Sequence, residues 1–168
     1  MLDAAFGAVG RLAERPSADF DFFMGIWRCR HRFLVRRLVD CRDWIEFDGC
    51  CAARRILGGW GNSDESEVNF PGDPYRAMTL RTWDPVRRKW TLYQLDRRRP
   101  GKLGAPVRGG FDKGLGVFLG DDRHEGRPIR VRCLWSRITE NSARWEQAFS
   151  ADNGGSWETN WYMDFARV

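Results

Sequence analysis

Long apolar runs, lysine and histidine are all scarce in this sequence. Only three of its 28 basic residues are lysines, and it contains two histidines. The N-terminal segment carries Asp3 and a six-residue apolar run at 4–9, which is shorter than the core of a secretory signal. No other segment approaches the length needed to cross a bilayer. We therefore expect a cytoplasmic protein with no membrane partner.

The usual metal and phosphate motifs are also missing. The five cysteines include no C-x-x-C pair and no zinc-ligand spacing, so free thiols that behave as small hydrophobes in a reducing compartment fit better. The glycine-rich stretch 58–62 lacks the Gly-Lys-Ser/Thr ending of a phosphate loop and predicts a bend or bulge. The acidic and histidine cluster at 121–125 spans a turn, where successive side chains diverge. The sequence predicts no metal and no cofactor.

Arginine is abundant, and the net charge of +5 brings nucleic acid into consideration. Arginine, glycine and alanine are, however, favoured together by GC-rich codons. Arg30 and Arg32 share the outward side of a predicted strand, and Glu146 and Asp164 have the same outward parity on other strands. This arrangement predicts cross-strand ion pairs rather than a phosphate-binding stripe. We expect no nucleic-acid partner.

Aromatic residues are the second abundant class. Nine Trp, eleven Phe and three Tyr make up 14% of the chain, a density that suits a sheet core or a cavity walled by rings. The 168 residues, with 42% hydrophobic and 30% charged side chains, are typical of one globular domain.

Period-two alternation predicts strands along most of the chain. The clearest example starts at Trp27, where apolar residues alternate with arginines up to Val35. The other candidates are 45–53, 64–70, 75–83, 90–96, 107–111, 116–121, 129–135, 145–149 and 157–165. About ten short strands separated by Gly or Pro turns indicate an all-β protein, either an antiparallel up-and-down barrel or a sandwich. Residues 2–14 predict a short amphipathic N-terminal helix.

The segment around Gly25-Ile26-Trp27 follows one predicted helical turn and opens the first strand. It resembles the G-x-W entrance of lipocalins and their calycin relatives, in whose barrels the tryptophan closes the narrow end and an arginine after the last strand stacks on it. Arg167 occupies the corresponding place here. This resemblance favours the barrel over the sandwich.

A wider resemblance covers Asp19 to Val168. The stretches GIWRCRHRFLVRRL (25–38) and SARWEQAFSADNGGSWETNWYMDF (142–165) resemble a bacterial family known only as a domain of unknown function, itself expected to be a lipocalin-like barrel. The resemblance implies a lipocalin-like β-barrel at 19–168, and the amphipathic pattern places a helical segment at 1–18 before it. It implies no catalytic residue, cofactor or substrate.

A local match lies at 150–157, which fits the S-x-D-x-G-x-x-W Asp-box of sialidases. It predicts a tight hairpin in which Asp152 accepts backbone N–H bonds, Gly154 supplies a positive φ and Trp157 packs beneath. One such box cannot build a propeller, so we infer no sialidase activity. The match supports pairing of the strands on either side of it.

If Trp27 points inward, strand parity predicts a pocket walled by aromatic rings. The candidate ligand-binding residues are Trp27, His31, Phe33, Trp135, Trp145, Gln147, Thr159, Trp161 and Met163. The leading hypothesis is a binding protein for a small hydrophobic or amphipathic molecule, with His31 and Gln147 as polar anchors. The alternative is that these two groups bond each other or backbone in a filled core.

Two other functions remain open at this point. A buried imidazole could serve as acid or base, so an isomerase, cyclase or hydrolase using His31 is possible, although no nucleophile or carboxylate is spaced to suggest a triad. Haem ligation by a late-strand histidine, as in some ten-stranded barrels, does not fit, because Trp and Asn stand there instead. The third possibility is a ligand-free interaction module that works as a homodimer.

Overall fold

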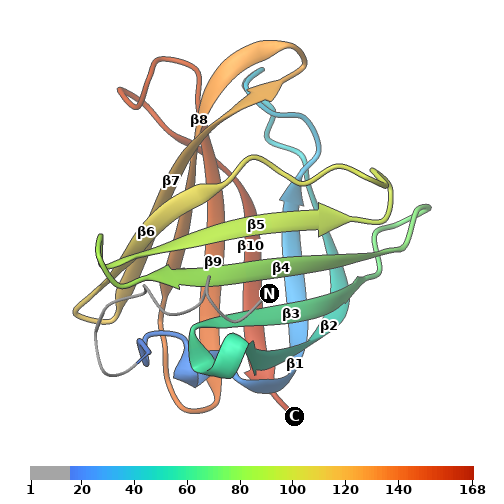
Figure 1. Cartoon of the computed structure of the whole chain (residues 1–168). Coiled ribbons are helices and arrows are strands. Elements are labelled where there is room, and N and C mark those ends of the chain that lie inside the picture. Colours follow the sequence, from blue (N-terminus) through green and yellow to red (C-terminus); the bar gives the residue numbers. More distant parts are fainter. Residues whose placement is uncertain (1–15) are drawn as a thin grey trace.

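The structure, a computed structural model, describes residues 16–168 and shows a closed antiparallel β-barrel (Figure 1). Each strand pairs with the next along the chain, and β1 pairs with β10 to close the barrel. The predicted all-β up-and-down barrel of about ten strands is confirmed. The strands are β1 (Gly25–Leu34), β2 (Trp44–Ile56), β3 (Gly61–Val68), β4 (Tyr75–Asp84), β5 (Lys89–Asp96), β6 (Val107–Asp112), β7 (Leu115–His124), β8 (Arg127–Ser136), β9 (Ser142–Ser150) and β10 (Glu158–Arg167).

Helical structure is minimal in the described part of the chain. It consists of two 3₁₀ turns, η1 (Asp21–Phe23) and η2 (Leu57–Gly59), and η1 lies in the segment that predicted a single turn. The predicted N-terminal helix at 2–14 lies outside the described residues. Among residues 16–168 there is no helix of the length and hydrophobicity that would be needed to span a membrane.

The alternating sequence of β1 explains its place in the barrel. Trp27, Cys29 and His31 are buried, whereas the arginines between them are exposed. Two hairpins also follow their sequence signals, because Lys113–Gly114 and Glu125–Gly126 both have positive φ at the two central residues, as a type I′ turn requires.

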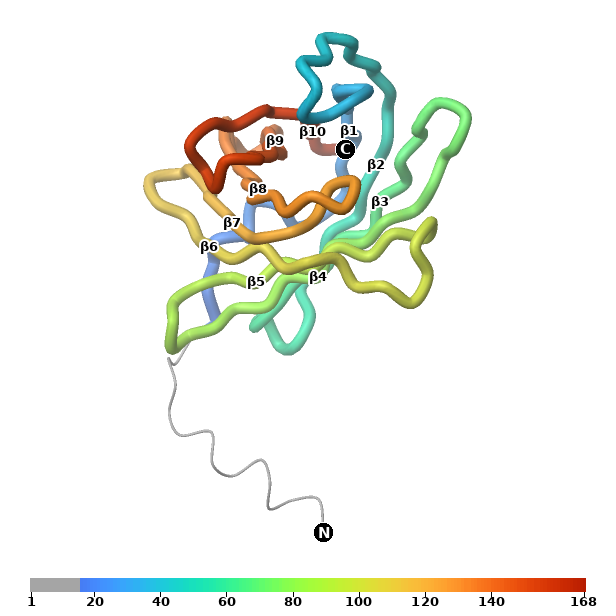
Figure 2. Tube along the Cα trace, turned by 90° about the horizontal axis from the view of Figure 1, so that it is seen from above, coloured from blue at the N-terminus to red at the C-terminus, as the bar shows by residue number. Residues whose placement is uncertain are grey.

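Successive connections alternate between the two ends of the barrel. One end, here called the open end, carries the β1–β2, β3–β4, β5–β6, β7–β8 and β9–β10 connections. The opposite end, here called the closed end, carries η1 and the remaining connections, including the one between β8 and β9 (Figure 1). Viewed from above, the strands surround a single interior (Figure 2).

Aromatic rings fill the closed end. The closed-end cluster is defined as Phe20, Phe23, Trp27, Phe118 and Trp135, each at most 2% exposed. The ring centroids of Phe23 and Trp135 lie 4.7 Å apart, and the rings meet in the tilted arrangements that aromatic pairs favour. This end of the barrel is therefore packed solid.

Arg167 covers the closed-end cluster from outside, as the sequence predicts. Its guanidinium carbon lies 4.1 Å from the centroid of the Trp27 ring, a cation–π contact. The same guanidinium donates hydrogen bonds to the backbone carbonyls of Phe22 and Met24 at 2.6 and 2.7 Å. The last strand is thereby joined to η1 and to the start of β1.

The outer face of the barrel carries the predicted cross-strand ion pairs. Arg30 lies 3.0 Å from both Glu46 and Asp48 on β2, and Arg144 on β9 pairs with Asp164 on β10 at 2.7 Å. Such exposed pairs contribute about 0–1 kcal/mol each. The arginines of these strands are therefore matched by acidic neighbours.

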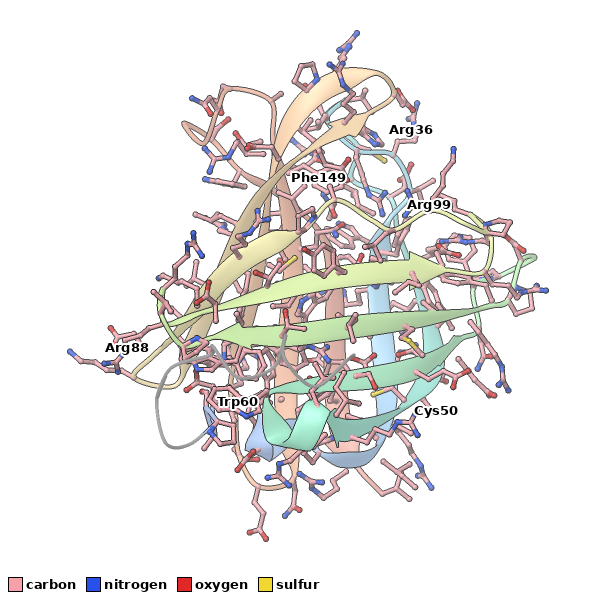
Figure 3. The ribbon with its side chains drawn as sticks, viewed as in Figure 1. Arg36, Cys50, Trp60, Arg88, Arg99 and Phe149 are labelled. Carbon is pink, nitrogen blue, oxygen red and sulfur yellow. The ribbon has the colours of Figure 1, made fainter. Side chains whose placement is uncertain are left out.

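All five cysteines are free thiols, in agreement with the prediction. Cys29, Cys51 and Cys133 are buried, and burial raises the pKa of Cys133 to about 12. Cys50 lies on the outer face of β2, where its side chain is exposed (Figure 3).

The turn between β9 and β10 has the predicted Asp-box geometry. Asp152 accepts hydrogen bonds from the Ser156 N–H at 2.9 Å and from the Ser150 hydroxyl at 2.7 Å, and Gly154 has a φ of 98°. The Ser156 N–H, with the two serine hydroxyls, holds the pKa of Asp152 well below its usual range. The box fixes the pairing of β9 with β10.

Candidate functional site

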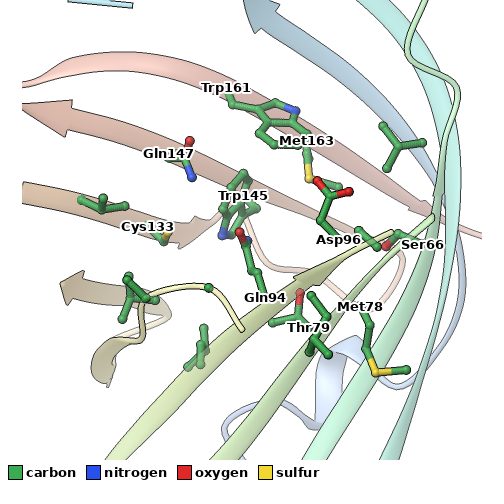
Figure 4. A pocket seen from close by; sticks show the side chains of 18 of the residues that line it. Ser66, Met78, Thr79, Gln94, Asp96, Cys133, Trp145, Gln147, Trp161 and Met163 are labelled. Carbon is green, nitrogen blue, oxygen red and sulfur yellow. The ribbon is translucent and has the colours of Figure 1, made fainter. Parts of the chain in front are cut away.

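The open half of the barrel contains a cavity of about 560 Å³, within the range of small-molecule sites. Exposed residues such as Arg98, Arg99 and Arg123 line it together with buried ones, so the cavity reaches the surface at the open end. Figure 4 shows the side chains around it.

Aromatic and sulfur-containing side chains form one wall of the cavity. β9 and β10 contribute most of them, because alternate residues of these strands face inward; they are Trp145, Phe149, Trp161 and Met163 (Figure 4 labels three of the four). The rings of Trp145 and Trp161 meet edge to face with centroids 5.8 Å apart. Phe33 on β1 packs its ring edge-on against Trp161 at 5.2 Å.

Polar side chains interrupt this wall at a few points. Gln147 on β9, Gln94 on β5 and Thr79 on β4 line the cavity from three directions (Figure 4). Amide and hydroxyl groups at these places can orient a ligand through hydrogen bonds without adding charge.

A buried ion pair forms part of the cavity floor, near the closed end. Arg81 on β4 contacts Asp64 on β3 at 2.5 Å, with side chains only 4% and 7% exposed. Arg81 also donates to the Asn62 side-chain oxygen at 3.1 Å, and its guanidinium carbon lies 5.1 Å from the Phe20 ring. The positive charge is thus matched by a carboxylate, an amide and an aromatic face.

Strand patterning does not predict this ion pair. β3 reads as a polar run and β4 mixes polar and apolar residues, so neither strand revealed which face is inward. Asn62 and Asp64 both lie beside Arg81, which packs on the η1 aromatics at the closed end. The available signal was charge of opposite sign at diagonal positions of the β3–β4 pair, since Arg81 faces Asn62 and Asp64 lies two residues further along β3.

His31 points inward as predicted, but it does not line the cavity. Its ring stacks on Phe47 at 4.7 Å, and its Nδ1 accepts a hydrogen bond from Trp161 Nε1 at 3.1 Å. Its Nε2 lies so close to Gly49 that a Cβ there would sit 2.8 Å from it. Burial lowers the pKa of His31 to about 4, so the imidazole is neutral near pH 7. It orients Trp161, which does line the cavity.

The structure brings most of the predicted site residues together. Six of the nine line the cavity: Phe33, Trp135, Trp145, Gln147, Trp161 and Met163. Trp27 lies outside the cavity wall, in the closed-end cluster.

Thr159 is also outside the cavity wall, and a β-bulge explains why. The pairing of β9 with β10 shifts between Thr159 and Trp161, and Asn160 is the extra residue. An extra residue reverses the alternation of side chains between the two faces. Thr159 therefore does not face inward, although it lies two residues before the inward Trp161.

The mouth of the cavity carries charged residues from loops that the strand pattern could not orient. The Arg98 guanidinium carbon lies 3.5 Å from the Tyr75 ring centroid, and Arg98 also binds Asp96 at 2.6 Å. Arg37, from the β1–β2 connection, packs on the Phe33 ring at 4.2 Å. In the sequence, nothing distinguishes these arginines from the many others.

In the part of the chain from residue 16 onward, no three His, Cys, Asp or Glu side chains gather in a way that could hold a metal ion. No protein-family model matches the sequence, and no curated protein matches it either.

Proposed function

We propose that this protein is a lipocalin-like binding protein for a small hydrophobic or amphipathic molecule, which it holds inside the barrel. One observation carries the proposal: the closed barrel has an aromatic-walled cavity of about 560 Å³ that reaches the surface at one end. Burial of apolar ligand surface against such walls contributes about 25 cal/mol per Å². The free thiols support a reducing, cytoplasmic setting.

Binding is a better account of this site than catalysis by His31. The imidazole lies outside the cavity wall, and its Nδ1 already accepts the Trp161 N–H. The other charged pair in the interior, Arg81 with Asp64, is mutually neutralised. A general base needs access to the proton it removes, and the position of His31 does not give it that access.

Binding of Nile red, an uncharged fluorescent probe, tests the proposal. We expect saturable fluorescence enhancement with the wild-type protein. Thr79→Trp should abolish it, because Thr79 lines the cavity and the larger ring would occupy ligand space. Leu80→Trp is the matched control, since Leu80 is the next residue of β4 and lies outside the cavity wall.

Two results would oppose the proposal. One is the absence of saturable Nile red binding to the wild-type protein, and the other is equal binding by both tryptophan variants. Native mass spectrometry of protein purified without denaturation gives an independent readout, because a retained ligand adds a defined mass.

A further inference from the structure

Arg37 differs from the exposed arginines Arg98, Arg99 and Arg123 of the cavity lining because it is half-buried. It follows β1 directly and belongs to the cavity lining. Its guanidinium carbon lies 4.2 Å from the Phe33 ring centroid and 5.4 Å from that of Phe149. Both rings also line the cavity. The cation is therefore held at the boundary between the mouth and the aromatic wall.

Arg37 lacks a counter-ion among the described residues. Within residues 16–168 no carboxylate oxygen lies within 4.0 Å of its guanidinium, and its Nε is buried without a hydrogen-bond partner. Burial lowers the pKa of Arg37 to about 10, so it remains charged near pH 7. A half-buried cation without a carboxylate partner raises the free energy of the ligand-free protein.

The neighbouring carboxylates are already engaged. Asp96 binds Arg98 at 2.6 Å, and Asp121 binds Arg130 at 2.9 Å. Asp122 accepts the Arg123 N–H at 2.8 Å. The Glu158 carboxylate accepts the Leu38 N–H at 2.8 Å. None of these four carboxylates lies within 4.0 Å of the Arg37 guanidinium, although the charge of Glu158 partly opposes the lowering of the Arg37 pKa.

The interior arginine Arg81 gives a comparison, because it is a buried guanidinium whose charge is matched by protein groups. It has Asp64 and Asn62 beside it, in addition to the aromatic faces of Phe20 and Phe23. Arg37 also packs on two aromatic rings, those of Phe33 and Phe149, but among residues 16–168 it has neither a carboxylate within 4.0 Å nor an amide partner.

We propose that the ligand is an amphipathic carboxylic acid, whose carboxylate binds Arg37 at the mouth while its apolar body lies against Phe33, Trp145 and Trp161. The inference rests on the proposed function and names the ligand class of the same cavity. The planar guanidinium fork matches the two oxygens of a carboxylate. Tyr75, which also lines the mouth, offers a hydroxyl as a further donor.

Displacement of Nile red by dodecanoate and by dodecanol tests the inference, because the two molecules share their chain and differ in the head group. We expect the wild-type protein to bind dodecanoate roughly 10- to 100-fold more tightly than dodecanol, the range of a charge-assisted hydrogen bond. Arg37→Gln should remove this preference by weakening dodecanoate alone. Arg37→Lys keeps the charge but loses the fork, so it should retain part of the preference.

Arg36→Gln is the matched control, since Arg36 is the adjacent, exposed arginine and is not part of the cavity lining. It should leave the preference unchanged. Thermal unfolding of each variant checks that the barrel is intact.

The outcomes separate this inference from the proposed function. Equal affinity of the wild-type protein for acid and alcohol, or a full preference retained by Arg37→Gln, would overturn the assignment of Arg37 while leaving the cavity as a binding site. Failure of Nile red and both chains to bind at all would overturn the two proposals together.

Discussion

The two ends of this barrel are built from the same kinds of residue, but one end is packed and the other holds a cavity. At the closed end, Phe23 and Trp135 pack ring against ring and form the floor of the cavity. At the open end, Trp145 and Trp161 stand in the wall of a cavity. Each end also holds an inward arginine; Arg81 pairs with Asp64, whereas Arg37 has no carboxylate within 4.0 Å among residues 16–168.

This difference shows that aromatic content alone does not decide whether a barrel interior is filled or hollow. What separates the ends is η1, which places Phe20 and Phe23 inside the closed end. No comparable segment enters the open end among the described residues. We infer that the closed end supplies most of the stability and the open end supplies the binding site.

The largest effect expected from this comparison concerns two phenylalanines. Phe23→Ala should lower the free energy of unfolding by about 4 kcal/mol, because it opens a cavity in a packed cluster. Phe33→Ala should cost less than about 2 kcal/mol, because the Phe33 ring is half-buried whereas Phe23 is only 1% exposed. Urea unfolding followed by tryptophan fluorescence measures both values, and equal costs would refute the division of roles.

The acidic partners of the inward and mouth arginines give the next comparison. Asp64→Asn should lower the free energy of unfolding by about 3 kcal/mol, since it leaves Arg81 buried without a counter-ion. Asp96→Asn, at the open end, should cost less than about 1 kcal/mol because Arg98 is solvated.

A second variant checks that the cost of Asp64→Asn comes from the unmatched charge. Combining it with Arg81→Gln should recover part of the lost stability, because the cation is then gone. A double variant that is less stable than Asp64→Asn alone would show that packing, not charge, sets the cost.

The smallest predicted effect is a pH dependence at His31, which stands behind the cavity wall. The native pKa of His31 is about 4, against an ordinary value of 6.5. Between these two pH values the unfolded chain binds a proton at His31 and the folded protein does not. Stability from this group is therefore complete above pH 6.5 and falls as the pH drops towards 4. Between about pH 7 and pH 5 the loss should be about 2 kcal/mol.

His31→Gln should remove this dependence, and His124→Gln should leave it in place, because His124 is the histidine at the open end. The difference in unfolding free energy between each variant and the wild-type protein, measured at both pH values, isolates the histidine from the carboxylates. A wild-type slope unchanged by His31→Gln would contradict the burial of a neutral imidazole.

Much of the fold could be predicted from the sequence where one strand face is apolar and the other charged. β1 and β10 are of this kind, and the expected contact of Arg167 with Trp27 is present. Parity failed at Thr159 because a bulge shifts the register of β10. An extra residue of this sort has no signal in a pattern of alternating hydrophobicity.

The charged parts of the site could not be predicted for a different reason. Asp64 and Arg81 are polar residues that face inward together, so neither strand shows the apolar face on which parity depends. Arg37 lies in a loop, where side-chain direction follows from tertiary contacts with Phe33 and Phe149. His31 was placed inward correctly, yet its Trp161 partner required the β1–β10 pairing.

The central claim is that the open half of the barrel holds an amphipathic acid with its head group at Arg37. The most direct test is a crystal structure of the protein grown with ω-bromododecanoic acid, in which anomalous scattering locates the bromine. The account predicts the carboxylate at Arg37 and the bromine deep in the cavity, on the side of Asp64 and Arg81. Bromine at Arg37 with the carboxylate at the floor, or bromine only outside the barrel, would contradict it.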